Sequence, residues 1–152
     1  MIPQEKLIAE LRRKLKGNQI ARRLCGRYHV NPEKLIDETP IRFEPLDVSA
    51  KTVDGEIILN DKLLGGKTRD MMRYLVHELT HVNQQKHNKV KELSNSEDYL
   101  EDDNEEEAFK TQVDYMEEVY SPEEIQTYLE GLVRHHGLTG KERIRKIKEL
   151  AR

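Results

Sequence analysis

This sequence of 152 residues has little of what several protein classes depend on. It has one cysteine, Cys25, which excludes a disulfide within the chain and indicates a reducing compartment. We expect this thiol to be a small buried hydrophobe rather than a metal ligand. Tryptophan is absent and only 5% of the residues are aromatic, so the predicted core is small and aliphatic.

Long apolar runs are also missing. The first residues, Met1 to Lys6, lack the uninterrupted apolar stretch of a signal peptide. No segment has the length and apolar character of a transmembrane helix. We therefore expect a soluble cytoplasmic protein that has no membrane partner.

Charged residues are abundant but nearly balanced in sign. They make up 36% of the chain, yet the formal net charge is only −3, which argues against a nucleic-acid partner. The charges do form blocks, basic over 12–27 and 141–152 and acidic over 97–107. We interpret each block as the solvated face of a helix rather than as a partner site.

The chain contains one His-Glu-x-x-His motif, formed by His77, Glu78 and His81. It lies in the segment 68–86, which has no Pro or Gly and carries an apolar stripe at helical spacing. The stripe consists of Met72, Leu75, Leu79 and Val82. On such a helix both imidazoles lie on one face, one turn apart, and reach one metal ion. Glu78 lies beside them, where it can hold a water molecule without being a ligand.

A catalytic zinc ion takes three protein ligands, and the acidic run 102–107 offers carboxylates for the third position. A helix through this run places Glu105 on one face with Ala108, Phe109 and Gln112, at helical spacing. Glu106 and Glu107 point increasingly toward other sides. We predict Glu105 as the ligand, brought opposite His81 by a loop between antiparallel helices. In the alternative interpretation, all these acids are solvated at a helix N-terminus.

Together these residues resemble the gluzincins, zinc peptidases in which a second helix supplies a glutamate to the metal. The Glu105-x-x-Ala108 pattern is similar to the E-x-x-A element of that clan, which marks Glu105, rather than the two glutamates after it, as the ligand. The small size is similar to that of the minigluzincins and of small regulatory gluzincins of phages and mobile elements. The similarity covers roughly 53–120. One departure is Asn83, where zincin helices usually carry an apolar residue.

The resemblance implies an α+β, minimal zincin-like fold, and the strand patterns agree with it. Alternation over 41–44 and an Asp-Gly turn before 56–60 predict a small, mostly antiparallel sheet of two to four strands. We expect this sheet to pack on the helix of His77 and on the helix of Glu105.

The chain has the size of one domain, and we predict a single zincin-like domain over 1–152. Its core is placed at about 41–120, with helical extensions over 1–38 and 121–152. Caps and apolar spacing predict the remaining elements. These are helices at 3–16, 19–25, 31–39, 102–120, 122–135 and 140–151, and a surface loop at 87–99.

The resemblance also implies that the chain hydrolyses peptide bonds. Zinc held by two neutral imidazoles and one carboxylate would keep a net positive charge and strongly acidify a bound water. Glu78 would take that proton as general base and deliver it to the leaving amine. The strand at 55–60 is the best candidate for pairing along a free edge with a peptide substrate, although an ordinary core strand explains it equally well. Candidates for stabilising the oxyanion, each also explained by a structural role, are Tyr99, Tyr115, Tyr120, His87, His135 and His136.

Two other functions are alternatives to a zinc peptidase that acts on a peptide or protein substrate. In one, zinc only fixes two helices together in a non-catalytic binding or regulatory module, where Glu78 would have no use. In the other, a nucleic-acid-associated metalloprotease docks on phosphates through Lys141, Arg143, Arg145, Lys146 and Lys148. The residues outside the core also allow a latent state, in which the helix within 1–17 or a dimer partner covers the cleft.

Overall fold

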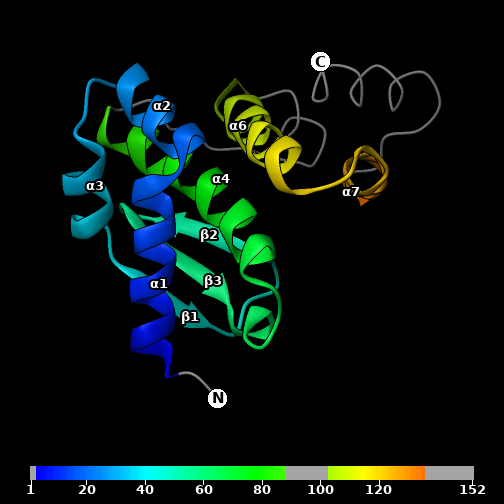
Figure 1. The fold of residues 1–152 in the computed structure, drawn as a ribbon, viewed down its shortest axis with the longest axis horizontal. Helices are drawn as coiled ribbons and strands as arrows, with labels where there is room; N and C mark the ends of the chain where they lie inside the picture. The colour runs from blue at the N-terminus through cyan, green and yellow to red at the C-terminus, as the bar shows by residue number, and fades with distance from the viewer. Residues whose placement is uncertain (1–2, 88–102, 136–152) are drawn as a thin grey trace. The chain divides into compact units, whose positions relative to one another are not determined.

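The computed structural model of the chain describes residues 3–87 and 103–135 (Figure 1). The chain divides into two compact units, Met1–Val90 and Lys91–Arg152. Helices and a small sheet occur together in the first unit, and the described part of the second unit is helical. This confirms the predicted α+β class. The domain boundaries drawn from the sequence stay a prediction.

Three short helices begin the first unit. They are α1 (Gln4–Gly17), α2 (Gln19–Arg27) and α3 (Pro32–Glu38). Two of them start at an asparagine cap. The side chain of Asn18 accepts hydrogen bonds from the backbone of Ile20 and Ala21, and that of Asn31 accepts one from Lys34.

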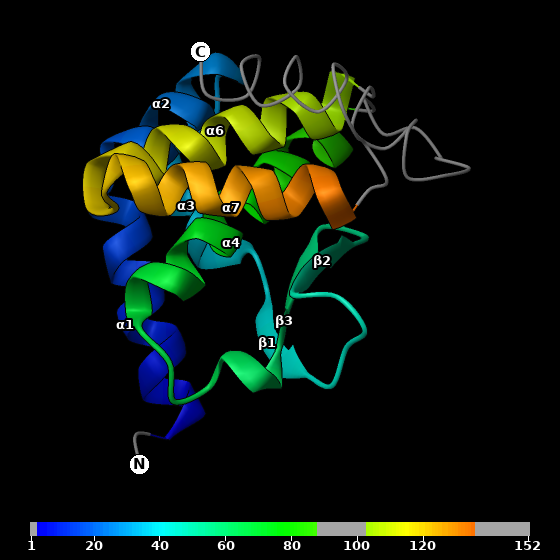
Figure 2. The same cartoon turned by 90° about the vertical axis from the view of Figure 1, so that its right-hand side faces the viewer.

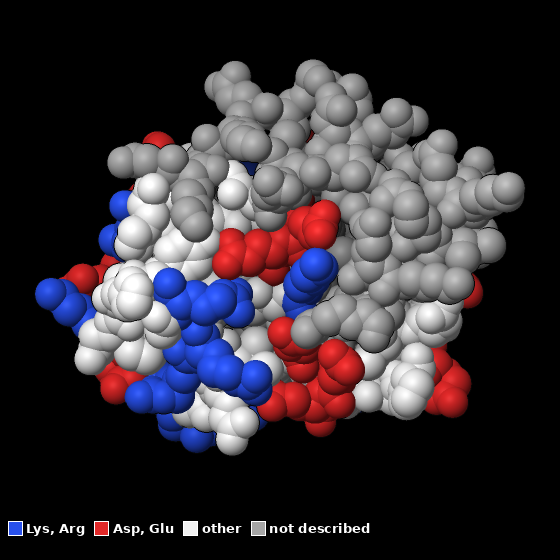
Figure 3. All heavy atoms as spheres, turned by 90° about the horizontal axis from the view of Figure 1, so that it is seen from above, with Lys and Arg blue, Asp and Glu red and all other residues white. Residues whose placement is uncertain are grey.

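Part of the basic block at the N-terminus packs these helices together. The guanidinium of Arg12 donates to the carbonyls of Ile36 and, at 2.7 Å, of Thr39, where the C-terminal end of α3 favours a cation. Two exposed ion pairs join the same helices, Lys16 with Asp37 and Arg22 with Glu33. Figure 3 shows Lys and Arg side chains gathered in a patch on one face. The contacts of Arg12, Lys16 and Arg22 therefore give part of the basic block a structural role.

A three-stranded sheet follows, made of β1 (Ile41–Glu44), β2 (Ala50–Val53) and β3 (Glu56–Asn60). The strands β2 and β3 form the predicted antiparallel hairpin, whose turn holds Asp54 and Gly55 at φ of 48° and 78°. The strand β1 pairs with β3 in parallel, so the sheet is mixed rather than mostly antiparallel. The reason is that the chain passes from β1 to the opposite edge before β3 returns between the two.

The strand predicted to offer a free edge to a substrate is in fact the central one. The order of the sheet is β1-β3-β2, and β3 is hydrogen-bonded on both sides. Its residues Ile57, Ile58 and Leu59 are at most 3% exposed. The free-edge prediction is wrong, and the alternative of an ordinary core strand is confirmed. The reason is that a continuous apolar run is typical of a strand buried on both faces, and such strands lie inside a sheet.

Helix α4 (Thr68–Lys86) carries the histidine motif and packs on β2 and β3 (Figure 2). It follows a single 3-10 turn, η1 (Asp61–Leu63), and its bounds coincide with the segment predicted from the sequence. The apolar stripe is at most 3% exposed at all four predicted positions. The helices α1 and α2 also contact α4. The N-terminal helices therefore belong to the same compact unit as the sheet.

The described part of the second unit consists of α6 (Asp103–Val119) and α7 (Pro122–His135), which contact each other. A reciprocal cap begins α7: Ser121 Oγ accepts from the Glu124 backbone at 3.1 Å, and Glu124 Oε1 accepts from the Ser121 backbone at 2.9 Å. Between the helices, Gln112 Nε2 donates to the Tyr128 hydroxyl at 2.7 Å.

Some predictions differ from the structure or fall outside its described part. Val119, the last residue of α6, is 39% exposed. The loop from residue 88 onward, the helix at 140–151 and the basic residues within it lie outside the described residues. Among the described helices, none has both the length and the apolar character that a membrane span requires.

Candidate metal centre

His77 and His81 lie on successive turns of α4 with their rings close together. The ring centroids are 5.0 Å apart and the ring planes meet at 68°. His77 is 4% exposed and His81 is half-buried. The pair has this arrangement because residues four apart in an α-helix share a face, as the motif predicts.

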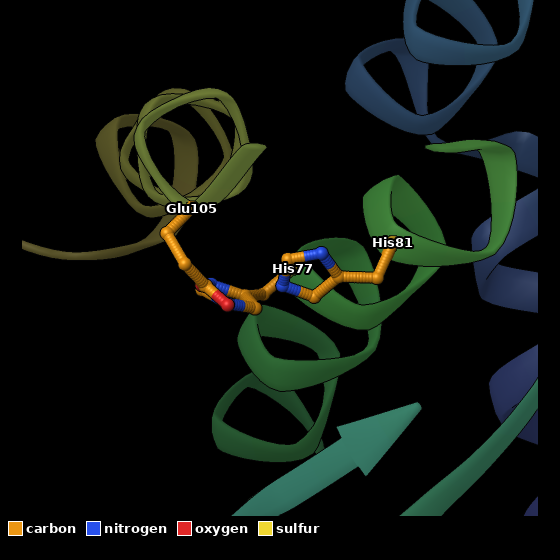
Figure 4. Close-up of side chains that lie close together, drawn as sticks. All are labelled: His77, His81 and Glu105. Atoms are coloured by element: carbon orange, nitrogen blue, oxygen red, sulfur yellow. The ribbon is translucent and has the colours of Figure 1, made fainter. Parts of the chain in front are cut away.

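The third side chain of the group is Glu105 (Figure 4). One ligand atom from each of His77, His81 and Glu105 lies within 4.8 Å of the other two. The three side chains are therefore close enough to bind a metal ion. Two imidazoles and one carboxylate are a donor set that divalent zinc accepts.

Burial on α6 separates Glu105 from the glutamates that follow it. Glu105 is only 9% exposed. The three residues expected on the same helix face are at most 4% exposed: Ala108, Phe109 and Gln112. Glu106 is half-buried and forms an ion pair with Lys110 at 3.2 Å. The helix face predicted for Glu105 is thus the buried one.

A buried amide holds the second histidine. His81 Nδ1 lies 2.7 Å from Gln84 Oε1, and Gln84 is 0% exposed. An amide oxygen only accepts hydrogen bonds, so this contact favours the tautomer of the neutral ring in which Nδ1 carries the proton and Nε2 has the lone pair for a metal ion. The sequence interpretation overlooked Gln84, although its position three residues after a ligand histidine on the same helix was a readable signal.

Glu78 lies beside the histidines and is 6% exposed. Its Oε2 atom is 4.0 Å from His77 Nε2. Its other oxygen, Oε1, accepts a hydrogen bond from the Thr52 hydroxyl at 2.8 Å. Nothing local in the sequence pointed to Thr52, because the packing of β2 on α4 brings together residues that are 26 positions apart.

The structure gives several of the oxyanion candidates a structural setting. His87 caps the end of α4, with Nδ1 2.9 Å from the Asn83 carbonyl and its ring 5.1 Å from that of Tyr28. Tyr115 is 5% exposed and Tyr120 is half-buried. Tyr99, His136 and the side chain of His135 lie outside the described residues.

Asn83, which stands where zincin helices usually carry an apolar residue, lies in the core of the first unit. Asn83 is 0% exposed and its Nδ2 donates to the Leu79 carbonyl at 3.2 Å. Cys25 is buried, as expected, and burial raises the pKa of its thiol, an effect opposed by a hydrogen bond with Asn83. The polar residue therefore packs inside the first unit, where its Nδ2 atom has a partner and its Oδ1 atom is buried without a hydrogen bond to another described residue.

Comparison with known proteins adds one match. The family model described as the eCIS core domain matches residues 41–89, just under a third of the chain. The matched residues run from the start of β1 past the end of α4, so they contain the histidine motif and Thr52 but not Glu105. Neither a curated protein nor a solved structure matched the chain. These comparisons show no gluzincin or protease family, and the gluzincin resemblance stays a prediction.

Proposed function

We propose that this chain is a zinc-dependent peptidase. In this proposal His77, His81 and Glu105 hold the ion and Glu78 is the general base. The observation that carries it is the convergence of two imidazoles and one carboxylate within 4.8 Å, with a further buried carboxylate beside them. A structural metal site would have no use for that fourth side chain.

The residues present fit a catalytic zinc site. Three protein ligands leave one coordination position open, and the contact with Gln84 orients the His81 ring so that Nε2, rather than Nδ1, is the nitrogen available to a metal ion. Two neutral imidazoles and one carboxylate leave the centre with a net positive charge. Zinc bound there would supply an acidified water molecule and polarisation of the scissile carbonyl.

Glu78 performs the proton transfers. Its Oε2 atom, on the side of His77 Nε2, accepts a proton from the attacking water, and the same carboxyl group then delivers that proton to the leaving amine. The carboxylate is nearly buried, so little solvent competes for its lone pairs. Its anchor to Thr52 keeps it beside the histidines.

An extended peptide pairs with β2 in this proposal, in place of β3. Among the described strands, β2 is the edge strand that contacts Glu78, through Thr52. Its backbone is paired with β3 on one side only, and its last residue, Val53, is 43% exposed. Strand addition at such an edge brings a substrate backbone alongside the sheet and close to the proposed base.

The test compares wild type with Glu78→Gln against a peptide library, while zinc content is measured by elemental analysis. Both proteins are expected to bind one zinc ion, and the variant is expected to lose on the order of 100- to 10,000-fold in kcat. The control, Glu38→Gln, removes an exposed carboxylate in α3 and should leave both readouts unchanged. A wild type that binds zinc but cleaves nothing would contradict the proposal and support a non-catalytic zinc module.

A further inference from the structure

We propose that Thr52 is a positioning residue for the general base. Its hydroxyl holds one oxygen of the Glu78 carboxylate, so that the other oxygen faces the metal-binding histidine and receives the proton. This inference rests on the proposed role of Glu78 and adds to it a residue from the sheet.

The two oxygens of Glu78 have different surroundings. The Thr52 hydroxyl is 2.8 Å from Oε1, whereas Oε2 is 4.0 Å from His77 Nε2. A hydroxyl has one proton, and a hydrogen bond to an ionised carboxylate is stronger than one between neutral groups. One lone pair of Oε1 is therefore engaged, while Oε2 lies on the side where the ion and its water would be.

The same hydroxyl has a second acceptor within reach, the backbone carbonyl of Glu78 at 3.1 Å. That carbonyl lies inside α4, where it accepts from the backbone four residues further on. The carboxylate oxygen Oε1 of Glu78 is closer to the Thr52 hydroxyl than this carbonyl is, and it carries negative charge when the carboxyl group is ionised. We therefore assign the proton of Thr52 to the carboxylate of Glu78.

A second pair of hydrogen bonds, made by Gln85, fixes the position of Thr52 along the axis of α4. Gln85 Nε2 donates to the Thr52 carbonyl at 3.3 Å, and Gln85 Oε1 accepts from the Gly55 backbone at 2.7 Å. Glu78 and Gln85 are seven residues apart, so the β2–β3 hairpin is attached to α4 at two points about two turns apart. The strand cannot slide along the helix without breaking both, and this rigidity is what a positioning residue needs.

The experiment uses the full chain with zinc and compares Thr52→Val with Thr52→Ser. Valine keeps the branched shape but has no hydroxyl, whereas serine keeps the hydroxyl. Thr52→Val is expected to lower kcat about 10-fold, with KM and zinc Kd each within about 2-fold of wild type, because one charge-assisted hydrogen bond is lost. Thr52→Ser is expected to stay within about 3-fold of wild type in all three.

Unchanged kcat in Thr52→Val would overturn the inference, and so would an equal loss in Thr52→Ser, which would indicate packing alone. A parallel loss of zinc affinity would also overturn it, since the role would then lie with the metal. If Thr52→Val does not fold, Thr52→Ala replaces it in the same comparison with serine. A wild type that binds zinc and is inert contradicts the peptidase itself, whereas an active wild type with an unaffected valine variant contradicts only the role of Thr52.

Discussion

His81 Nδ1 lies 2.7 Å from the amide oxygen of Gln84, which is completely buried three residues further along α4. This hydrogen bond selects the tautomer in which Nε2 is free to bind a metal ion. Replacing Gln84 with alanine removes the acceptor, so we expect zinc affinity to fall about 10- to 100-fold. Competition with a chromophoric chelator measures the change.

The neighbouring residue supplies the matched control for this prediction. Gln85 has the same side chain but directs its amide to Thr52 and Gly55. Gln85→Ala should therefore leave zinc affinity within about 2-fold of wild type, because it touches no proposed ligand. Equal losses in the two variants would show that general loosening of α4, and not the contact with His81, sets the affinity.

Adjacent glutamates on α6 test the proposed third ligand. Glu105→Ala removes a carboxylate that lies within 4.8 Å of both histidine ligand atoms, and should weaken zinc binding by more than about 100-fold, beyond the effect of an outer-shell change. Glu106→Ala removes an equal charge that is paired with Lys110, and should have little effect. Elemental analysis after dialysis reports both. Retention of zinc by Glu105→Ala would exclude this residue as a ligand.

The stability of the first unit depends on the apolar face of α4. Leu75 is 0% exposed, so Leu75→Ala should lower the free energy of unfolding by about 2–5 kcal/mol, from lost transfer energy and a residual cavity. Val53→Ala shortens a side chain that is 43% exposed and should cost about 0.5 kcal/mol or less. Urea unfolding followed by circular dichroism gives both values. Similar losses would contradict the assignment of the core.

Because Cys25 is buried, we expect its thiol to react slowly with thiol reagents in the folded protein. The side chain is 0% exposed, and burial raises its pKa, so native protein should react with a thiol reagent such as DTNB far more slowly than urea-unfolded protein. The raised pKa also stabilises the fold below the ordinary thiol pKa. That contribution is lost as the pH rises, since the unfolded chain releases the proton first. Fast labelling of folded protein would place the thiol at the surface.

Local patterns predicted most elements because the forces that form them act over a few residues. The bounds of α4 coincide with the predicted segment, since its apolar stripe and its lack of Pro and Gly are read within 68–86. The hairpin turn at Asp54 and Gly55 was also local. The position of β3 between two strands was not, because alternation and turn signals do not tell a strand which neighbours it will pair with.

What the sequence alone determined is the pairing of His77 with His81 on one helix face, because the α-helix has a fixed period and four residues span one turn. Even the partner of His81 was readable within the next turn. Only the tertiary structure decided which residue holds the proposed base. Thr52 reaches Glu78 across 26 positions because β2 packs on α4, and sheet–helix packing depends on the whole core rather than on any local run of residues.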